Sequence, residues 1–297
     1  MRILLLYFTG TYNTRYVTNL LKKRFVELDN QVTTLEINSS TEVISLEGYD
    51  LIGLGYPIYA FNAPSIFISY LNKLIINPKA KYFIYKNSGE TLGFNNASSR
   101  EIKHLLKKNK AELVNEKHFI MPYNIMFRFK DNCIKESLNY DDKLADILVY
   151  ELYNGIKSII KNNLLYELTS LAFTIQRPGA KINHYFYKVD ETKCTKCHMC
   201  VNTCPTSNIY VDEEGKIKFK NNCIMCMRCS FLCPVDAINI GMLNPVKVNK
   251  PYNLQKIKSD ETLDGKFIKE DQKGFFRCYK KTYKNIDLTY DKYFKNG

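Results

Sequence analysis

The chain has 297 residues, a hydrophobic fraction of 45% and a formal charge of +13. This length suits two domains with cores of their own. No apolar run approaches the ~20 residues of a membrane span, and the short run at residues 3–8 has no signal-cleavage site after it, so we expect a cytoplasmic protein without a membrane span. No basic helix or RNA-binding motif accompanies the charge, and we therefore expect no nucleic-acid partner.

Strand-like and helix-like segments alternate through the first half of the chain. Apolar or alternating runs predict five strands, at residues 2–8, 31–37, 50–56, 81–86 and 112–121. Apolar residues at helical spacing predict helices between and after them, at residues 17–28, 65–75, 98–108 and 144–159. This order predicts an α/β fold with a doubly wound, five-stranded parallel sheet.

The second half begins with another apolar stretch, residues 164–175. We interpret it as a connecting helix that ends at Arg177-Pro178-Gly179, because Pro and Gly interrupt helices. Beyond Gly241 the chain is rich in Lys and Tyr and has little periodicity. Its composition predicts a solvated extension over residues 243–297, with a cover over the preceding domain as the alternative.

Eight of the ten cysteines lie in two copies of the pattern C-x2-C-x2-C-x3-C-P, CTKCHMCVNTCP and CIMCMRCSFLCP. Three thiolates at three-residue intervals can wrap one face of an iron–sulfur cubane, while the fourth, before Pro, ligates the other cluster. Zinc would not require a third and fourth cysteine in each run, and disulfides are rare in unsecreted chains. The pattern predicts two [4Fe-4S] clusters with crossed ligands, Cys194, Cys197, Cys200 and Cys233 for the first and Cys223, Cys226, Cys229 and Cys204 for the second.

This region resembles the bacterial two-cluster ferredoxins, and both motifs match without a lost ligand. Between the motifs, residues 209–211 and 217–219 flank a polar turn with Gly215, which predicts a β-hairpin. The resemblance implies a small α+β ferredoxin domain with an electron-transfer role.

A loop rich in hydroxyl groups follows the first strand and opens the first helix. It contains Thr9, Gly10, Thr11, Tyr12, Asn13 and Thr14. Such a turn presents N–H groups and the positive end of the helix dipole to a phosphate, although the same residues could serve as an ordinary N-cap. In the phosphate loops that this turn resembles, Gly usually stands at the position of Tyr12, and we expect Tyr12 to fit only with a negative φ.

The loop resembles the FMN-phosphate loop of flavodoxins, and the order of strands and helices is similar to the flavodoxin-like fold. The resemblance implies FMN at the carboxyl ends of the strands. Tyr59 or Phe61 could then stack on the flavin ring, and the backbone around Ser88 could bond its edge. The candidate ring-binding residues are Pro57, Ile58, Tyr59, Ala60, Phe61, Asn87, Ser88 and Gly89.

Residues 1 to about 240 resemble a family of flavodoxin–ferredoxin fusion proteins from anaerobic bacteria, which also share stretches similar to residues 55–64, 88–90 and 121–124. This resemblance implies electron transfer between the clusters, FMN and redox partner proteins. A flavin-dependent reductase fed by its own ferredoxin domain is one alternative, and a ferredoxin with an empty flavodoxin-like docking domain is another. The expected divisions are a flavodoxin-like domain at 1–163, a connecting helix and linker at 164–184, a ferredoxin domain at 185–242 and an extension at 243–297.

Overall fold

The computed structural model describes residues 1–295, apart from the side chain of His184, so the end of the expected extension lies outside it. Its main sheet has five parallel strands in the order β2-β1-β3-β4-β5. The strands are β1 Arg2–Tyr7, β2 Gln31–Glu36, β3 Leu51–Pro57, β4 Lys81–Ser88 and β5 Glu112–Ile120. This order is that of the flavodoxin-like doubly wound fold, which confirms the predicted fold class.

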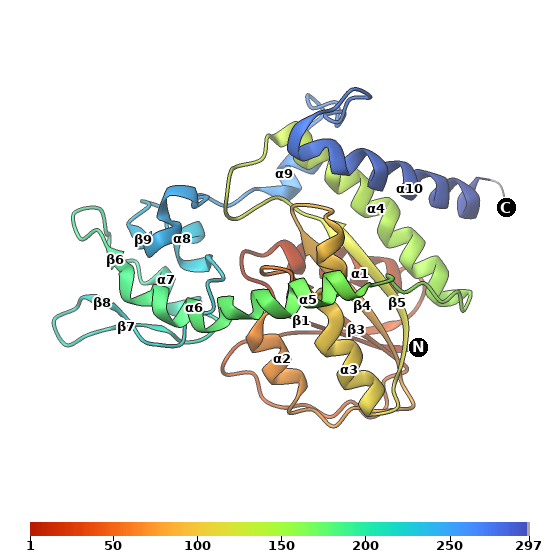
Figure 1. Ribbon diagram of the computed structural model, residues 1–297, viewed down its shortest axis with the longest axis horizontal. Helices are drawn as coiled ribbons and strands as arrows, with labels where there is room; N and C mark the ends of the chain where they lie inside the picture. Colours follow the sequence, from red (N-terminus) through yellow and green to blue (C-terminus); the bar gives the residue numbers. More distant parts are fainter. Residues whose placement is uncertain (296–297) are drawn as a thin grey trace.

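Helices cover both faces of the sheet (Figure 1). Successive strand residues point to opposite faces, so Ile3 and Leu5 join a core with α1 and α4, while Leu4 and Leu6 join a core with α2 and α3. The helices are α1 Asn13–Val26, α2 Ser65–Leu71, α3 Arg100–Lys108 and α4 Asp131–Tyr153, and the 3-10 helix η1 spans Gly93–Ser99.

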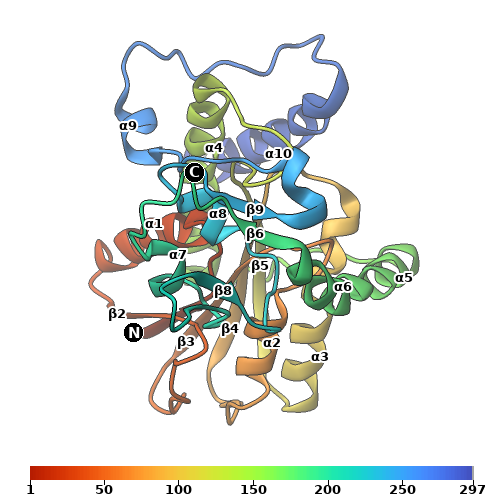
Figure 2. The same ribbon diagram turned by 90° about the vertical axis from the view of Figure 1, so that its left-hand side faces the viewer.

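A small second domain lies against the carboxyl ends of the main strands (Figures 1 and 2). Strands β6 and β9 pair antiparallel, and β7 and β8 form the predicted hairpin with Gly215 at φ 75 in its turn. The elements are β6 Tyr187–Val189, α7 Met199–Asn202, β7 Ile209–Val211, β8 Ile217–Phe219, α8 Arg228–Leu232 and β9 Ile238–Ile240, with short 3-10 helices at His184–Phe186 and Gly241–Val246.

The helix expected at residues 144–159 is wrong at both ends. Helix α4 already begins at Asp131 and ends at Tyr153, so Ile156 and Ile159 lie beyond it. Gly155 adopts a φ of 65, a left-handed conformation that ends helices. The chain then runs beside β5, where Ser158 bridges to Asn115. The prediction was too long because apolar residues at helical spacing, Ile156 and Ile159, continue beyond the last residue of the helix.

The expected end of the connecting helix at Pro178-Gly179 is also wrong. The chain passes from α5 (Leu164–Ala172) through η2 (Phe173–Ile175) into α6 (Gln176–Asn183), and both residues lie inside α6. Pro178 is in the first turn of α6, where a backbone N–H would have no partner within the helix. Proline therefore costs this helix little.

The C-terminal segment is packed, contrary to the expected solvated extension. Helix α9 spans Leu254–Ser259, and the 3-10 helix η5 (Gly274–Phe276) leads into α10 (Arg277–Phe294). Helix α10 lies on α4 (Figure 1), and the rings of Tyr140 and Tyr283 stack with centroids 3.8 Å apart. Tyr279, Tyr283 and Ile286 are buried, because their spacing puts them on one face of the helix.

Within residues 1–295, no helix combines the length and the apolar character that crossing a bilayer would require.

Candidate cofactor sites at the domain interface

A cavity of about 510 Å³ lies between the two domains. Loops that follow β1, β3 and β4 form one side of it, and residues of the second domain form another. The structure brings together every residue predicted for the flavin site except Tyr12. These lining residues are Thr9, Gly10, Thr11, Asn13, Thr14, Pro57, Ile58, Tyr59, Ala60, Phe61, Asn87, Ser88 and Gly89.

The loop before α1 has the features of a phosphate site. No side chain caps the N-terminus of α1, and its first turn carries no acidic residue. The hydroxyl oxygen of Thr9 is buried without a hydrogen-bond partner among residues 1–295. Gly10 is required for space, because a Cβ there would lie 2.2 Å from the Tyr59 hydroxyl and 2.8 Å from the Cys226 carbonyl. Free N–H groups and an unpaired hydroxyl suit the phosphate of FMN.

Tyr12 occupies the loop in a way that the sequence did not predict. Its φ is 72, so the expectation that a Tyr fits only with a negative φ is wrong. The ring does not line the cavity. Its centroid lies 4.4 Å from the guanidinium of Arg15 and 5.2 Å from that of Arg228. With this left-handed backbone the ring lies outside the cavity and does not crowd the candidate phosphate position.

Aromatic and acidic side chains line the part of the cavity that would face a flavin ring. Phe61 meets Phe173 edge-on at 5.0 Å, and the Tyr123 hydroxyl donates a hydrogen bond to the Glu90 carboxylate. Sequence reasoning noted residues 88–90 and 121–124 only through the family resemblance. It missed the residues that come from the connecting helices and the second domain, namely Phe173, Gln176, Met225, Met227 and Leu243. Nothing in the sequence positions of these residues predicts that they line one cavity.

His118 supports the cavity wall from behind, where its Nε2 lies 2.8 Å from the Ser88 hydroxyl. Burial and the nearby Lys86 ammonium lower the pKa of His118 to about 3.

Between about pH 6.5 and pH 3 the unfolded chain therefore binds a proton at His118 that the folded chain does not. The free energy of unfolding decreases as the pH is lowered through that window. We expect a loss of up to about 1.4 kcal/mol per pH unit from this residue. Urea titrations from pH 6 to pH 4 should show a flatter profile for His118→Gln, and an unchanged profile would contradict this assignment.

The eight motif cysteines surround two separate cavities in the second domain. One is lined by Cys194, Cys197, Cys200 and Cys233. The other is lined by Cys204, Cys223, Cys226 and Cys229. Among residues 1–295, no three His, Cys, Asp or Glu side chains lie close enough together to hold a single metal ion, so the two groups are defined by the cavities they enclose. The fourth cysteine of each motif thus lies with the first three of the other.

The two cysteine loops share one backbone conformation. Left-handed φ values of 57 at Lys196 and 55 at His198 recur as 51 at Met225 and 63 at Met227. Backbone N–H groups already donate to three of the cysteine sulfurs. Met225, in one of these loops, donates to Cys223 at 3.3 Å, and Asn208 and Ala237, which follow the fourth cysteines, donate to Cys204 at 3.3 Å and Cys233 at 3.2 Å. N–H···S bonds of this kind tune the potential of iron–sulfur clusters.

Burial makes the cysteine sulfurs poor thiolates unless iron binds them. It raises the pKa of Cys200 to about 11 and that of Cys226 to about 12. Iron coordination would displace the proton, because only the thiolate is a ligand. The donor set and the paired cavities therefore fit two iron–sulfur clusters.

Comparison with known proteins supports iron–sulfur clusters in the second domain. The 4Fe-4S dicluster domain family matches residues 193–237. The pyruvate synthase subunit PorD of Methanocaldococcus jannaschii is 33% identical over 79 residues, which cover 24% of this chain and 92% of that protein. The archaeal-type glutamate synthase [NADPH] of Dehalococcoides mccartyi is 35% identical over 65 residues, 21% of this chain but only 13% of that protein.

The N-terminal half is similar to solved flavodoxins. Flavodoxin 2 from Bacillus cereus aligns with a TM-score of 0.38 and 19% identity over 51% of this chain and 99% of that one. The strand order carries the fold assignment. The chain is a fusion of a flavodoxin-like domain with a ferredoxin domain of the 4Fe-4S dicluster family. Electron transfer is the class of activity that these two domains define.

Proposed function

We propose that this protein passes electrons between two [4Fe-4S] clusters and an FMN held in the interdomain cavity, in exchange with redox partner proteins. One observation carries the proposal. Met225 and Met227, which separate the cysteines of the second motif, line the same cavity as the phosphate loop and the ring-binding segments. A cluster held by that motif would therefore lie beside the flavin, as electron transfer between them requires.

The chain's own residues suffice to bind FMN. The N-terminus of α1 and the Thr9 hydroxyl would hold the phosphate, and Tyr59 and Phe61 would contact the ring. Bound FMN would supply a centre able to store one or two electrons. The protein's part is to orient the ring, exclude water and set the potential.

The ligands we propose for the first cluster are Cys194, Cys197, Cys200 and Cys233, and those for the second are Cys223, Cys226, Cys229 and Cys204. Cys197 is exposed, whereas Cys226 is buried at the domain interface. The first cluster would thus exchange electrons with a partner, and the second would connect it to the flavin. Ligation by free thiols also supports the proposed cytoplasmic location, where thiols stay reduced.

Cofactor analysis tests the proposal directly. Anaerobically purified protein should contain about eight iron, eight sulfide and one FMN per chain, with cluster absorbance that dithionite bleaches. The measurements are iron and sulfide assays together with flavin released by denaturation. Iron without flavin, even after incubation with FMN, would favour the docking-domain alternative. Zinc in place of iron would refute the electron-transfer proposal.

The reductase alternative makes a different prediction. An enzyme would turn over a small substrate steadily when a reduced carrier is in excess, whereas an electron carrier would only equilibrate. Met225 and Met227 cover one wall of the cavity. Because these second-domain residues close that side of the cavity, the arrangement favours electron exchange with the second cluster over entry of a substrate.

A further inference from the structure

We propose that Arg228 is a positioning residue that couples FMN binding in one domain to the second cluster in the other, with Tyr12 as its support. The inference rests on the proposed function and deepens it. Arg228 lies between Met227 and Cys229, inside the second cysteine motif, yet its guanidinium is buried against the first domain, with 6% of the residue exposed.

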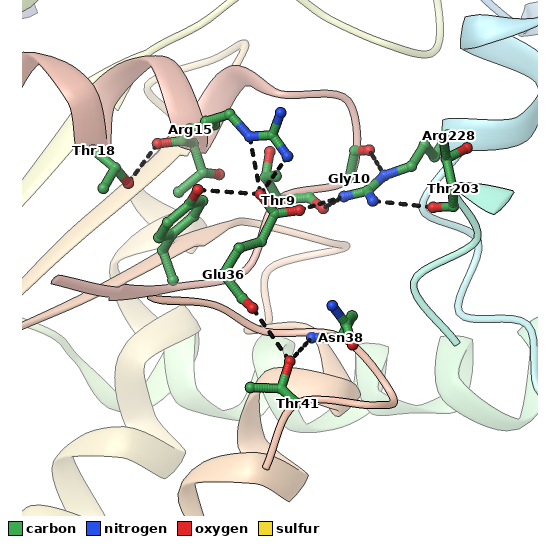
Figure 3. Close-up of polar contacts among 11 residues, drawn as sticks. Thr9, Gly10, Arg15, Thr18, Glu36, Asn38, Thr41, Thr203 and Arg228 are labelled. Atoms are coloured by element: carbon green, nitrogen blue, oxygen red, sulfur yellow. Dashed lines mark hydrogen bonds and ion pairs between the residues drawn. The ribbon is translucent and has the colours of Figure 1, made fainter. Parts of the chain in front are cut away.

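The hydrogen bonds of Arg228 join the two loops that would hold the cofactors (Figure 3). Its Nε donates to the Gly10 carbonyl at 2.6 Å, and its Nη2 donates to the Thr9 carbonyl at 2.5 Å. Its Nη1 donates to the Thr203 carbonyl at 3.0 Å, next to Cys204. One planar group from the second motif therefore binds both the candidate phosphate loop and the segment that supplies Cys204 to the second cluster.

Bonds to these carbonyls order the loop for an anion. A trans peptide whose carbonyl oxygen is bonded to Arg228 directs its N–H group the opposite way. The hydroxyl of Thr9, a residue that lines the cavity, is buried without a hydrogen-bond partner among residues 1–295. Arg228 and Arg15 share the single carboxylate of Glu36, at 3.2 Å and 2.6 Å. The group of three keeps a net positive charge beside the loop, which favours a bound phosphate.

The conformation of Tyr12 is explained by the same contact. A left-handed backbone is unfavourable for a residue with a side chain, and Gly would adopt it without steric cost. In return, the Tyr12 ring lies against the guanidinium groups of both Arg15 and Arg228. Cation–π attraction in these two contacts offsets the unfavourable backbone conformation. Tyr12 thus belongs to the junction with the ferredoxin domain, and not to the phosphate site itself.

Coupling of this kind is reciprocal: if the cluster loop strengthens FMN binding, FMN must stabilise the cluster loop. The test uses the full chain with its clusters, freed of FMN. Fluorescence quenching measures FMN affinity, and the decay of cluster absorbance in the presence of an iron chelator measures cluster loss with and without FMN. For the wild type we expect FMN to bind and to slow the loss of the second cluster.

Arg228→Gln should weaken FMN binding about tenfold or more, as expected for lost bonds from a charged donor, and should abolish the protection of the cluster by FMN. Arg228→Lys keeps the positive charge but cannot donate to the three carbonyls at once. It should therefore also lose most of the protection of the cluster by FMN. Tyr12→Gly should also weaken FMN binding, although a simple phosphate loop would bind equally or better with Gly. Tyr12→Phe keeps the ring and should restore the coupling.

Arg128→Gln is the matched control. Arg128 also lies over a Tyr ring, at 4.3 Å from that of Tyr252, and donates to two backbone carbonyls, but it does not contact the phosphate loop. It should leave FMN affinity unchanged. If the wild type binds FMN but Arg228→Gln and Tyr12→Gly bind it within twofold and keep the protection, the coupling is refuted while the proposed function stands. If the wild type binds no FMN, the proposed function itself fails.

Discussion

Replacing Cys204 by Ala should remove the cluster beside the flavin, although Cys204 belongs to the first cysteine motif. Its side chain lines the cavity of Cys223, Cys226 and Cys229, so that cluster would lose a ligand. Iron should fall from about eight to about four per chain. FMN should then no longer be reduced through the remaining cluster, because the link between them is lost. Iron assays and single-turnover reduction of the bound flavin measure both effects.

Cys233→Ala is the reciprocal variant. Cys233 belongs to the second motif but lines the cavity of Cys194, Cys197 and Cys200. The same iron loss is expected, but the second cluster should still exchange electrons with FMN. Cys278→Ala, outside both motifs, should keep all the iron. If the flavin of Cys204→Ala is still reduced and that of Cys233→Ala is not, each motif holds its own cluster and the crossed assignment is wrong.

Glu116→Gln should destabilise the flavodoxin-like domain by about 3–5 kcal/mol, the cost of leaving a buried charge unpaired. Glu116 on β5 lies 2.8 Å from the Lys86 ammonium on β4, and both side chains are fully buried. Lys86 also donates to the carbonyl of Asn95, which ties η1 to the sheet behind the cavity. Urea denaturation followed by far-ultraviolet circular dichroism measures the loss in the free energy of unfolding.

The pH dependence gives this prediction a second readout. Burial alone would raise the pKa of Glu116, but Lys86 and Lys103 outweigh it and lower the pKa. A lowered carboxyl pKa contributes stability above the unfolded value of about 4.3 and loses it as pH falls. The wild type should therefore lose this contribution in acid, and Glu116→Gln should not.

Two variants control for the loss of charge itself. Glu112→Gln, on the same strand, breaks an ion pair with Lys157 in which both side chains are more than half exposed, and it should cost less than about 1 kcal/mol. Adding Lys86→Met to Glu116→Gln removes the unpaired ammonium and should recover most of the stability. A single Glu116→Gln variant as stable as Glu112→Gln would contradict the importance of the buried pair.

Local patterns predicted the five strands well, because buried parallel strands are short apolar runs bounded by turns. They failed where one local signal had two structural meanings. Pro178 predicted the end of a helix but lies in the first turn of one. The Lys-rich segment around Tyr279 and Tyr283 has the composition of a solvated segment, but one face of it is apolar and buried. Only the surface of α4, which covers that face, distinguishes a packed helix from an exposed one.

The sequence by itself determined the iron–sulfur character of this protein, because cysteine spacing indicates two clusters, and the loop after β1 predicts a phosphate site. These signals are local, since neighbouring residues form each loop. Only the tertiary structure decided that Met225 and Met227 line the interdomain cavity and that Arg228 bonds the loop after β1. Those contacts join residues some two hundred positions apart, and side chains of that separation meet only when the two domains pack against each other. Tyr12, a departure from the usual loop, makes physical sense only beside Arg228.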